Sequence, residues 1–269
     1  MKNREEIDYG NWVSGSMMRM WTVATLIAAA LCAVSFMPFT VLWPSAARWA
    51  IRGILLTLMV GLLVTTIYFG ICRRLFSYKG KSQIQSRILD YVLSYLKFDS
   101  GKILDIGCGN GALSIKAAKK FPSGIVTGMD YWGSVWDFAK EQCEANAKRE
   151  GVSDRVSFQK GDAAGLAFPD ESFDGAVSNF VFHEVRSQPD KRLVVKEALR
   201  VVKKGGAFAF HDLYFEKNFY GDIDNFVCRL KAEGIHEIHL VCSKDEPFIP
   251  KILKSSFMLG RIGLLYGIK

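Results

Sequence analysis

Three glycines at alternate positions, Gly107, Gly109 and Gly111, constrain the fold of this chain more than any other feature. The β-prone residues 102–106 lead into them, and a helical pattern follows over 111–121. This order predicts a strand, a tight turn and the start of a helix. Glycines allow positive φ and a close approach of the backbone to a bound molecule, and the first free N–H groups of the helix point towards it. The stretch is therefore expected to hold a ligand.

An acidic residue, Asp105, lies two positions before the first glycine. The spacing Gly107-x-Gly109-x-x-Ala112 fits the looser fingerprint of a dinucleotide site. A carboxylate at this point would repel a pyrophosphate and attract a cation. S-adenosylmethionine is positively charged and carries no phosphate, so it suits the site better than NAD. An NAD-dependent oxidoreductase stays the less favoured alternative.

From about Ser82 to its C-terminus the chain resembles the class I S-adenosylmethionine-dependent methyltransferases. Residues 103–111 match the first cofactor motif of that family, and three further segments match in the same order, at 125–130, 161–174 and 202–206. The resemblance implies an α/β fold with a Rossmann-like seven-stranded methyltransferase sheet, mostly parallel, whose last strand is antiparallel.

The resemblance also implies which residues hold the cofactor. Asp105 and the glycines would lie around its methionine end, and Cys108 would present its backbone N–H rather than its thiol. Asp130 would bind both ribose hydroxyls, Asp162 would meet the adenine amino group, and either aromatic residue after Asp130 could pack on the adenine. The expected cofactor-binding residues are Asp105, Gly107, Cys108, Gly109, Gly111, Asp130, Tyr131, Asp162, Ala163 and Asn179.

His183, which follows the fourth expected strand, is the candidate catalytic residue. The sulfonium is a good leaving group, so alignment of the acceptor and exclusion of water can supply most of the acceleration, and only a proton-bearing acceptor needs a base. In the family a histidine at this place is common whatever the substrate. No base is compelling, so a membrane-tethered sensor that binds the cofactor without turnover is an alternative to an enzyme.

Strand and helix patterns alternate through the second part of the chain. This alternation predicts a parallel sheet flanked by helices, with the ligand at the carboxyl ends of the strands. The expected strands are 102–106, 125–130, 155–159, 174–179 and 206–212, the expected helices are 111–121, 134–150 and 189–202, and a helix at 222–234 with strands at 236–242 and 262–268 completes the sheet.

Two uncharged, mostly apolar runs, Met20–Ala47 and Gly53–Cys72, precede this part of the chain. A helix of about 20 apolar residues crosses the hydrocarbon core of a membrane. We therefore expect transmembrane helices at about 20–43 and 53–72. A cleaved signal peptide fits less well, because the first run is too long and acidic residues precede it.

These helices predict a membrane hairpin and connector over 1–81, followed by a class I methyltransferase domain over 82–269. Basic residues set the orientation of such a hairpin. Two lie in the loop between the runs and seven on the outer flanks, namely Arg48 and Arg52 against Lys2, Arg4, Arg19, Arg73, Arg74, Lys79 and Lys81. The chain is therefore expected to be a multi-pass protein of the cell membrane, with the catalytic domain and both termini in the cytoplasm.

The formal net charge of +8 comes mainly from residues 1–81, which hold nine basic and three acidic residues. No nucleic-acid partner is expected, and the scattered cysteines and histidines predict no metal site. A small-molecule or lipid acceptor remains, and the hairpin favours an amphiphile. The mouth of its pocket is expected between an amphipathic helix at 84–96 and the aromatic residues Phe215, Phe219 and Tyr220.

Overall fold

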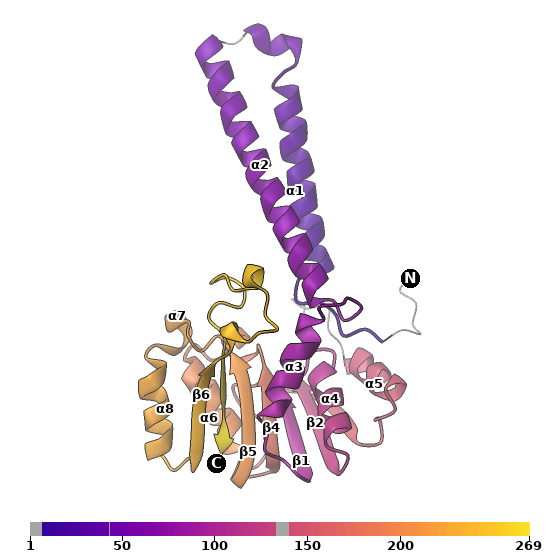
Figure 1. The fold of residues 1–269 in the computed structure, drawn as a ribbon, viewed down its shortest axis with the longest axis vertical. Helices are drawn as coiled ribbons and strands as arrows, with labels where there is room; N and C mark the ends of the chain where they lie inside the picture. The colour runs from indigo at the N-terminus through magenta and orange to yellow at the C-terminus, as the bar shows by residue number, and fades with distance from the viewer. Residues whose placement is uncertain (1–6, 43, 133–139) are drawn as a thin grey trace. The chain divides into compact units, whose positions relative to one another are not determined.

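The structure is a computed structural model that describes residues 7–42, 44–132 and 140–269. It divides into two compact units (Figure 1). One unit is residues 11–85, and the other is Ser86–Lys269 together with the segment that ends at Gly10. The sequence predicts that all of 1–81 belongs to the hairpin and its connector. In the structure, the residues up to Gly10 group with the second unit instead, because Asp8 and Tyr9 hydrogen bond to Asn146 and Glu150.

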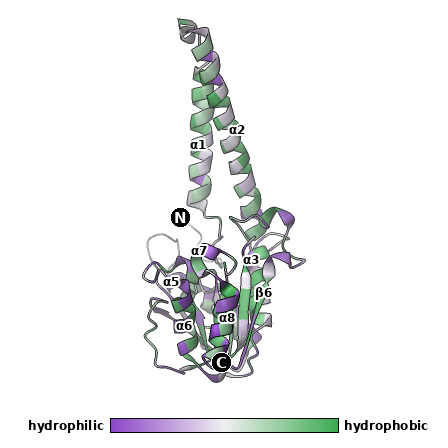
Figure 2. Ribbon diagram, turned by 90° about the vertical axis from the view of Figure 1, so that its left-hand side faces the viewer, coloured by the Kyte–Doolittle hydropathy of each residue, from purple (hydrophilic) through white to green (hydrophobic). Residues whose placement is uncertain are grey.

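The hairpin unit contains α1 (Gly15–Val34), the 3-10 turn η1 (Pro38–Leu42) and α2 (Ser45–Phe76). Hydrophobic residues run along both long helices (Figure 2). The hydroxyls of Thr25 and Thr66 form a hydrogen bond of 2.9 Å that links α1 to α2. Both helices are long and apolar enough to cross a membrane, by length and composition.

The ends of these helices differ from the predicted limits, 20–43 and 53–72. Ser35 caps α1, and Pro38, which has no N–H to continue an α-helix, begins η1. The predicted loop is the first part of α2, so Arg52 lies on a helix. Its Nε donates to the carbonyl oxygen of Ser35 at 3.0 Å.

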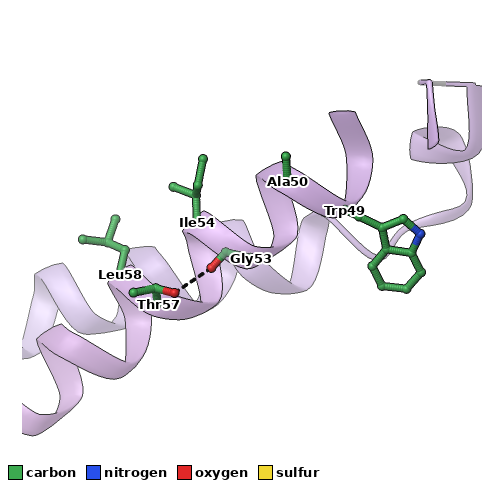
Figure 3. A pocket seen from close by; sticks show the side chains of 6 residues that line it. All are labelled: Trp49, Ala50, Gly53, Ile54, Thr57 and Leu58. Atoms are coloured by element: carbon green, nitrogen blue, oxygen red, sulfur yellow. Dashed lines mark hydrogen bonds between the residues drawn. The ribbon is translucent and has the colours of Figure 1, made fainter. Parts of the chain in front are cut away.

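An open depression lies on the surface of α2 (Figure 3). It is lined by Trp49, Ala50, Gly53, Ile54, Thr57 and Leu58. The Thr57 hydroxyl donates to the Gly53 carbonyl of its own helix at 2.9 Å. A mostly apolar hollow on one helix suits lipid chains, whereas a cofactor site needs convergent polar groups.

The second unit is built on a seven-stranded sheet with the order β3-β2-β1-β4-β5-β7-β6 (Figure 1). The first five strands are parallel, and β7 runs antiparallel to both of its neighbours. The strands are β1 (Gly101–Ile106), β2 (Gly124–Asp130), β3 (Val156–Lys160), β4 (Phe173–Asn179), β5 (Val202–Asp212), β6 (Glu237–Cys242) and β7 (Gly263–Ile268). This arrangement confirms the predicted Rossmann-like methyltransferase sheet.

Helices flank the sheet (Figure 1). They are α3 (Ile84–Ser94), α4 (Ala112–Lys120), α5 (Lys140–Arg149), α6 (Lys191–Arg200), α7 (Lys217–Tyr220) and α8 (Ile223–Ala232), with the 3-10 turns η2 (Phe182–Glu184), η3 (Ser243–Asp245) and η4 (Lys251–Leu253). The helix predicted at 134–150 is described only from Lys140, since 133–139 lie outside the described residues. Strand β5 begins four residues earlier than predicted, at Val202.

The central strands are buried on both faces, and their register places the candidate site. Ile106 of β1 pairs with Ser178 of β4, and Asn179 pairs with His211 of β5. The carboxyl ends of β1, β4 and β5 therefore lie side by side at one edge of the sheet. In an open parallel sheet this edge is where a ligand binds.

Gly267 of β7 lies directly against the backbone of the neighbouring strand β6. A Cβ atom at this position would lie 1.8 Å from the backbone oxygen of Glu237 on β6, so the strands would have to separate. We expect Gly267→Ala to lower the free energy of unfolding by about 3 kcal/mol, measured by chemical denaturation of the detergent-solubilised protein. Gly165→Ala is the control, because nothing lies within 4 Å of its added Cβ. Equal stabilities of the two variants would contradict the β6–β7 pairing.

Candidate active site

The glycine turn between β1 and α4 requires glycine for its conformation. Gly107, Gly109 and Gly111 have φ values of 76°, 56° and 80°, in the left-handed region. A Cβ atom on Gly107 would also lie 2.1 Å from the Val181 side chain. The N–H of Gly111 closes the turn on the carbonyl of Cys108 at 2.8 Å.

The N–H groups of this turn are used within the fold. Gly107 and Cys108 both donate to the carbonyl oxygen of Met129, at 2.7 and 3.0 Å, and Gly109 donates to Asp130 Oδ2 at 2.8 Å. The sequence predicts that Cys108 presents its N–H to the cofactor, but here that N–H donates to Met129, and a role of Cys108 in cofactor binding stays a prediction. The turn is thus closed onto the end of β2, and its first three N–H groups already have acceptors within the fold.

Asp105 is fully buried at the end of β1. Ser114 Oγ donates to its Oδ2 at 2.5 Å, whereas Oδ1 has no hydrogen-bond partner among the described residues. Burial raises the pKa of Asp105 to about 7, opposed by the Ser114 hydroxyl and reinforced by the negative charge of Asp130. A buried carboxylate oxygen without a partner is costly, and a cationic ligand group would compensate it.

Asp130 lies at the end of β2, as predicted. Its Oδ1 accepts the N–H of Trp132 at 2.9 Å, and Trp132 Nε1 donates to the carbonyl of Gly109 at 2.9 Å. Tyr131, the predicted aromatic neighbour of the cofactor, is 62% exposed, and Lys160 Nζ lies 5.4 Å from its ring centroid. The indole that contacts the glycine turn is therefore Trp132.

Asp162 and Ala163 lie in the loop after β3. The N–H of Gly161 donates to the carbonyl of Asp130 at 3.0 Å, which brings this loop beside the end of β2. Asp162 Oδ1 accepts the N–H of Ala164 at 2.9 Å. The Ala163 side chain is buried in the hydrophobic core, so a cofactor could meet this residue only through its backbone.

Asn179, at the end of β4, is oriented by a buried histidine. His211 Nδ1 lies 2.9 Å from Asn179 Oδ1, and His211 Nε2 lies 2.8 Å from Ser243 Oγ. Burial lowers the pKa of His211 to about 4, so the ring is neutral at physiological pH. Since the carbonyl oxygen of Asn179 accepts the Nδ1 proton, its amide NH₂ is available to a ligand. Ser243 lies far from His211 in the chain, so no sequence pattern predicts this contact.

His183 is held between two carboxylates. Its Nδ1 lies 2.7 Å from Asp212 Oδ1, and its Nε2 lies 3.5 Å from Glu184 Oε1. Burial lowers the pKa of His183, but the charges and hydrogen bonds of Asp212 and Glu184 outweigh it and raise the pKa to about 10. A charged imidazolium donates protons and does not accept them, so the arrangement favours a structural role. The predicted role as a base stays a prediction.

Asp212 has a structural role that the sequence did not predict. It is fully buried at the end of β5, and its oxygens accept the N–H groups of Phe182 at 2.8 Å and Leu213 at 2.6 Å in addition to His183. These bonds fix the segment after β4, where Phe180 has a left-handed φ of 57°. The signal in the sequence is an acidic residue at the end of an apolar strand pattern.

The predicted apolar mouth is only partly present. Tyr220 is fully buried and packs on Tyr214, and the Phe219 ring lies 5.7 Å from the ring of His183. The prediction is therefore wrong for Tyr220, which belongs to the core. Other aromatic rings surround His211, with centroid distances of 5.0 Å for Phe180 and 6.4 Å for Tyr91 of α3.

The His183–Asp212 pair predicts a pH-dependent stability. Since the folded-state pKa of His183 lies above its ordinary value of 6.5, its contribution is present below pH 6.5 and is lost as pH rises through about 10. We expect His183→Ala to lower the free energy of unfolding by about 3 kcal/mol near pH 6, and by progressively less towards pH 10, in chemical denaturation. His239→Ala, at an exposed ion pair with Glu237, is the control. A loss that does not vary with pH would refute the ion pair.

Comparisons with known proteins bear on this site. Residues 103–206 match the family model described as a methyltransferase domain. The chain is 36% identical over 111 residues to a sterol 24-C-methyltransferase of Aspergillus fumigatus, covering 41% of this chain and 27% of that protein. It is also 36% identical over 107 residues to a ubiquinone/menaquinone biosynthesis C-methyltransferase of Bradyrhizobium sp., covering 39% and 40%. The chain thus spans less than half the length of these curated relatives.

A solved structure agrees in fold. The S-adenosylmethionine-dependent methyltransferase from Aquifex aeolicus superposes with a TM-score of 0.50 and 18% identity, over 71% of this chain and 95% of that chain. The family match, the order of the seven strands and the antiparallel β7 all agree with the predicted resemblance. Residues 103–206 are thus similar to the methyltransferase-domain family, and the sheet that contains them has the fold of the class I S-adenosylmethionine-dependent methyltransferases.

Proposed function

We propose that this protein is a membrane-anchored S-adenosylmethionine-dependent methyltransferase that acts on a small-molecule or lipid-like acceptor. The observation that carries the proposal is Asp105, a buried carboxylate with one unpartnered oxygen directly before a glycine turn. A cationic cofactor supplies the charge that this oxygen lacks. The family match over residues 103–206 supports the same cofactor.

The closed turn disfavours the dinucleotide alternative. A pyrophosphate is normally held by free backbone N–H groups at a glycine turn and a helix N-terminus. Here the N–H groups of Gly107, Cys108 and Gly109 already have acceptors within the fold. Asp105 and Asp130 would add two nearby carboxylates, which repel phosphate.

The residues present fit the parts of the cofactor. Asp105 and the glycine turn would hold its methionine end, and Asp130 would bind the ribose hydroxyls through lone pairs that Gly109 and Trp132 leave free. Asp162 would contact the adenine. Asn179, oriented by His211, would present its NH₂ at the carboxyl end of β4.

Catalysis by this site would depend on the alignment of the acceptor with the methyl group of the cofactor. The bound cofactor supplies a methyl group on a sulfonium, which is a good leaving group. The protein would orient the acceptor and exclude water, for which the rings of Tyr91 and Phe180 beside His211, and of Phe248 beside Tyr91, are suited. His183 would hold the segment after β4 through Asp212, and a soft nucleophile would need no base.

The hairpin and the relatives favour a lipid-like acceptor. The two relatives are named for sterols and for ubiquinone or menaquinone, which are lipid-soluble. An enzyme that is anchored by two helices would meet such an acceptor within the membrane. The sensor alternative is less favoured, since methyl transfer to a soft nucleophile needs no base and both relatives are named methyltransferases.

The orientation of the hairpin can be tested with reporter fusions. Seven basic residues on the outer flanks against two near the tip predict that both termini are cytoplasmic. We expect reporters at either terminus to give a cytoplasmic signal, and a reporter inserted near Ser45 to give a signal from the opposite side. Signals from one side at all three positions would show that the hairpin does not span the membrane.

Cofactor binding should depend on the ionisation of Asp105. Because the pKa of Asp105 is raised to about 7 and a cation favours the carboxylate, binding near pH 6 should release a proton, and affinity should rise towards pH 8. We expect calorimetry of the full chain to show this release in buffers of different ionisation enthalpy. Asp105→Asn should abolish it and weaken binding by about tenfold or more.

Two further variants serve as a second test and as a control. Asp130→Ala should also weaken binding about tenfold, whereas Asp170→Asn, at an exposed ion pair with Arg200, should not. Absence of binding by the wild-type protein, or a preference for NAD, would contradict the proposal. Binding without transfer of labelled methyl groups to native membrane extracts would instead favour the sensor.

A further inference from the structure

The segment before the hairpin belongs to the methyltransferase unit. Residues up to Gly10 cluster with Ser86–Lys269, although the whole hairpin lies between them in sequence. The apolar hairpin is thus an insertion between two parts of one unit. Only Tyr9 and Gly10 separate Asp8 from the first residue of the hairpin unit, Asn11.

Asn146 of α5 binds this segment through its side chain. The N–H of Asp8 donates to Asn146 Oδ1 at 3.0 Å, and Asn146 Nδ2 donates to the carbonyl of Asp8 at 2.9 Å. These two bonds resemble the reciprocal N–H···O=C bonds between two paired β-strands. Directly after α5, Glu150 accepts the hydroxyl of Tyr9 at 2.8 Å. The segment is therefore docked on α5 by both backbone and side-chain contacts.

The same asparagine also holds the glycine turn. Asn146 is fully buried, and its Nδ2 donates to the carbonyl of Asn110, between Gly109 and Gly111, at 3.0 Å. Its Oδ1 accepts a second bond, from Gln142 Nε2 at 3.0 Å. Both donors and the oxygen of this amide are engaged, so undocking of the segment would leave a buried amide partly unsatisfied.

We propose that Asn146 is a positioning residue that couples docking of residues 8 and 9 to the glycine turn, so that affinity for S-adenosylmethionine depends on the segment that leads into the membrane hairpin. The inference rests on the proposed function, since it assigns the turn to that cofactor. Asn146 sets the direction of the Asn110 carbonyl, and with it the peptide planes that carry the positive φ values of Gly109 and Gly111. The cofactor site thereby extends to residues before the hairpin.

Three variants of the full chain in detergent micelles test the coupling by calorimetry with S-adenosylmethionine. Asn146→Ala should weaken binding about tenfold. Tyr9→Phe removes the bond to Glu150, far from the turn in sequence, and should weaken binding about threefold. Asn218→Ala, at an exposed position of α7, should leave affinity unchanged.

Hydrogen exchange can distinguish this coupling from a general loss of stability. Coupling is reciprocal, so saturating S-adenosylmethionine should slow exchange in a peptide that covers residues 7–12 of the wild-type protein, and Asn146→Asp, which keeps the acceptor and loses both donors, should abolish that slowing. If the cofactor binds and protects residues 107–111 but leaves 7–12 unchanged, and if Tyr9→Phe binds as tightly as wild type, the coupling is refuted. If the wild-type protein does not bind the cofactor, the proposed function fails instead.

Discussion

The carbonyl oxygen of Met129 accepts the N–H groups of Gly107 and Cys108, and the rest of the site depends on this junction. It fixes the end of β1 against the end of β2, and the next N–H, from Gly109, goes to Asp130. These three N–H groups are thereby satisfied within the fold, whereas the nearby Asp105 keeps an unpartnered carboxylate oxygen. The spacing of the glycines fits two classes of cofactor, but the carboxylates of Asp105 and Asp130 attract a cation and repel a phosphate.

Two fully buried carboxylates, at the ends of β5 and β1, differ in what surrounds them. Asp212 faces His183 and backbone N–H groups, which lower its pKa against the opposing effect of burial. Asp105 has the single hydroxyl of Ser114 and lies near the like charge of Asp130, so burial dominates and raises its pKa. The first carboxylate is neutralised inside the fold and holds the segment after β4. The second keeps an unpartnered oxygen, which is the property expected of a ligand site.

Local patterns in the sequence predict the sheet and the place of the site, because strand and helix periodicities and the glycine turn are encoded by neighbouring residues. Asp105, Asp130 and Asn179 were predicted at strand ends for this reason. Contacts between residues far apart in the chain carried no such signal. The bond of Cys108 to Met129, the contact of His211 with Ser243 and the docking of Asp8 on Asn146 depend on register and topology.

Helix α2 is longer than the hydrocarbon core of a membrane is thick. Its 32 residues extend about 48 Å, against about 30 Å of hydrocarbon, so a membrane can hold the uncharged run Gly53–Cys72 while the arginines at both ends lie beyond it. Arg52 has a partner there, since it donates to Ser35. The hairpin unit joins the methyltransferase unit by two covalent connections, at Gly10 and at Ser86. The first lies two residues from Asp8, which the buried side chain of Asn146 joins to the glycine turn.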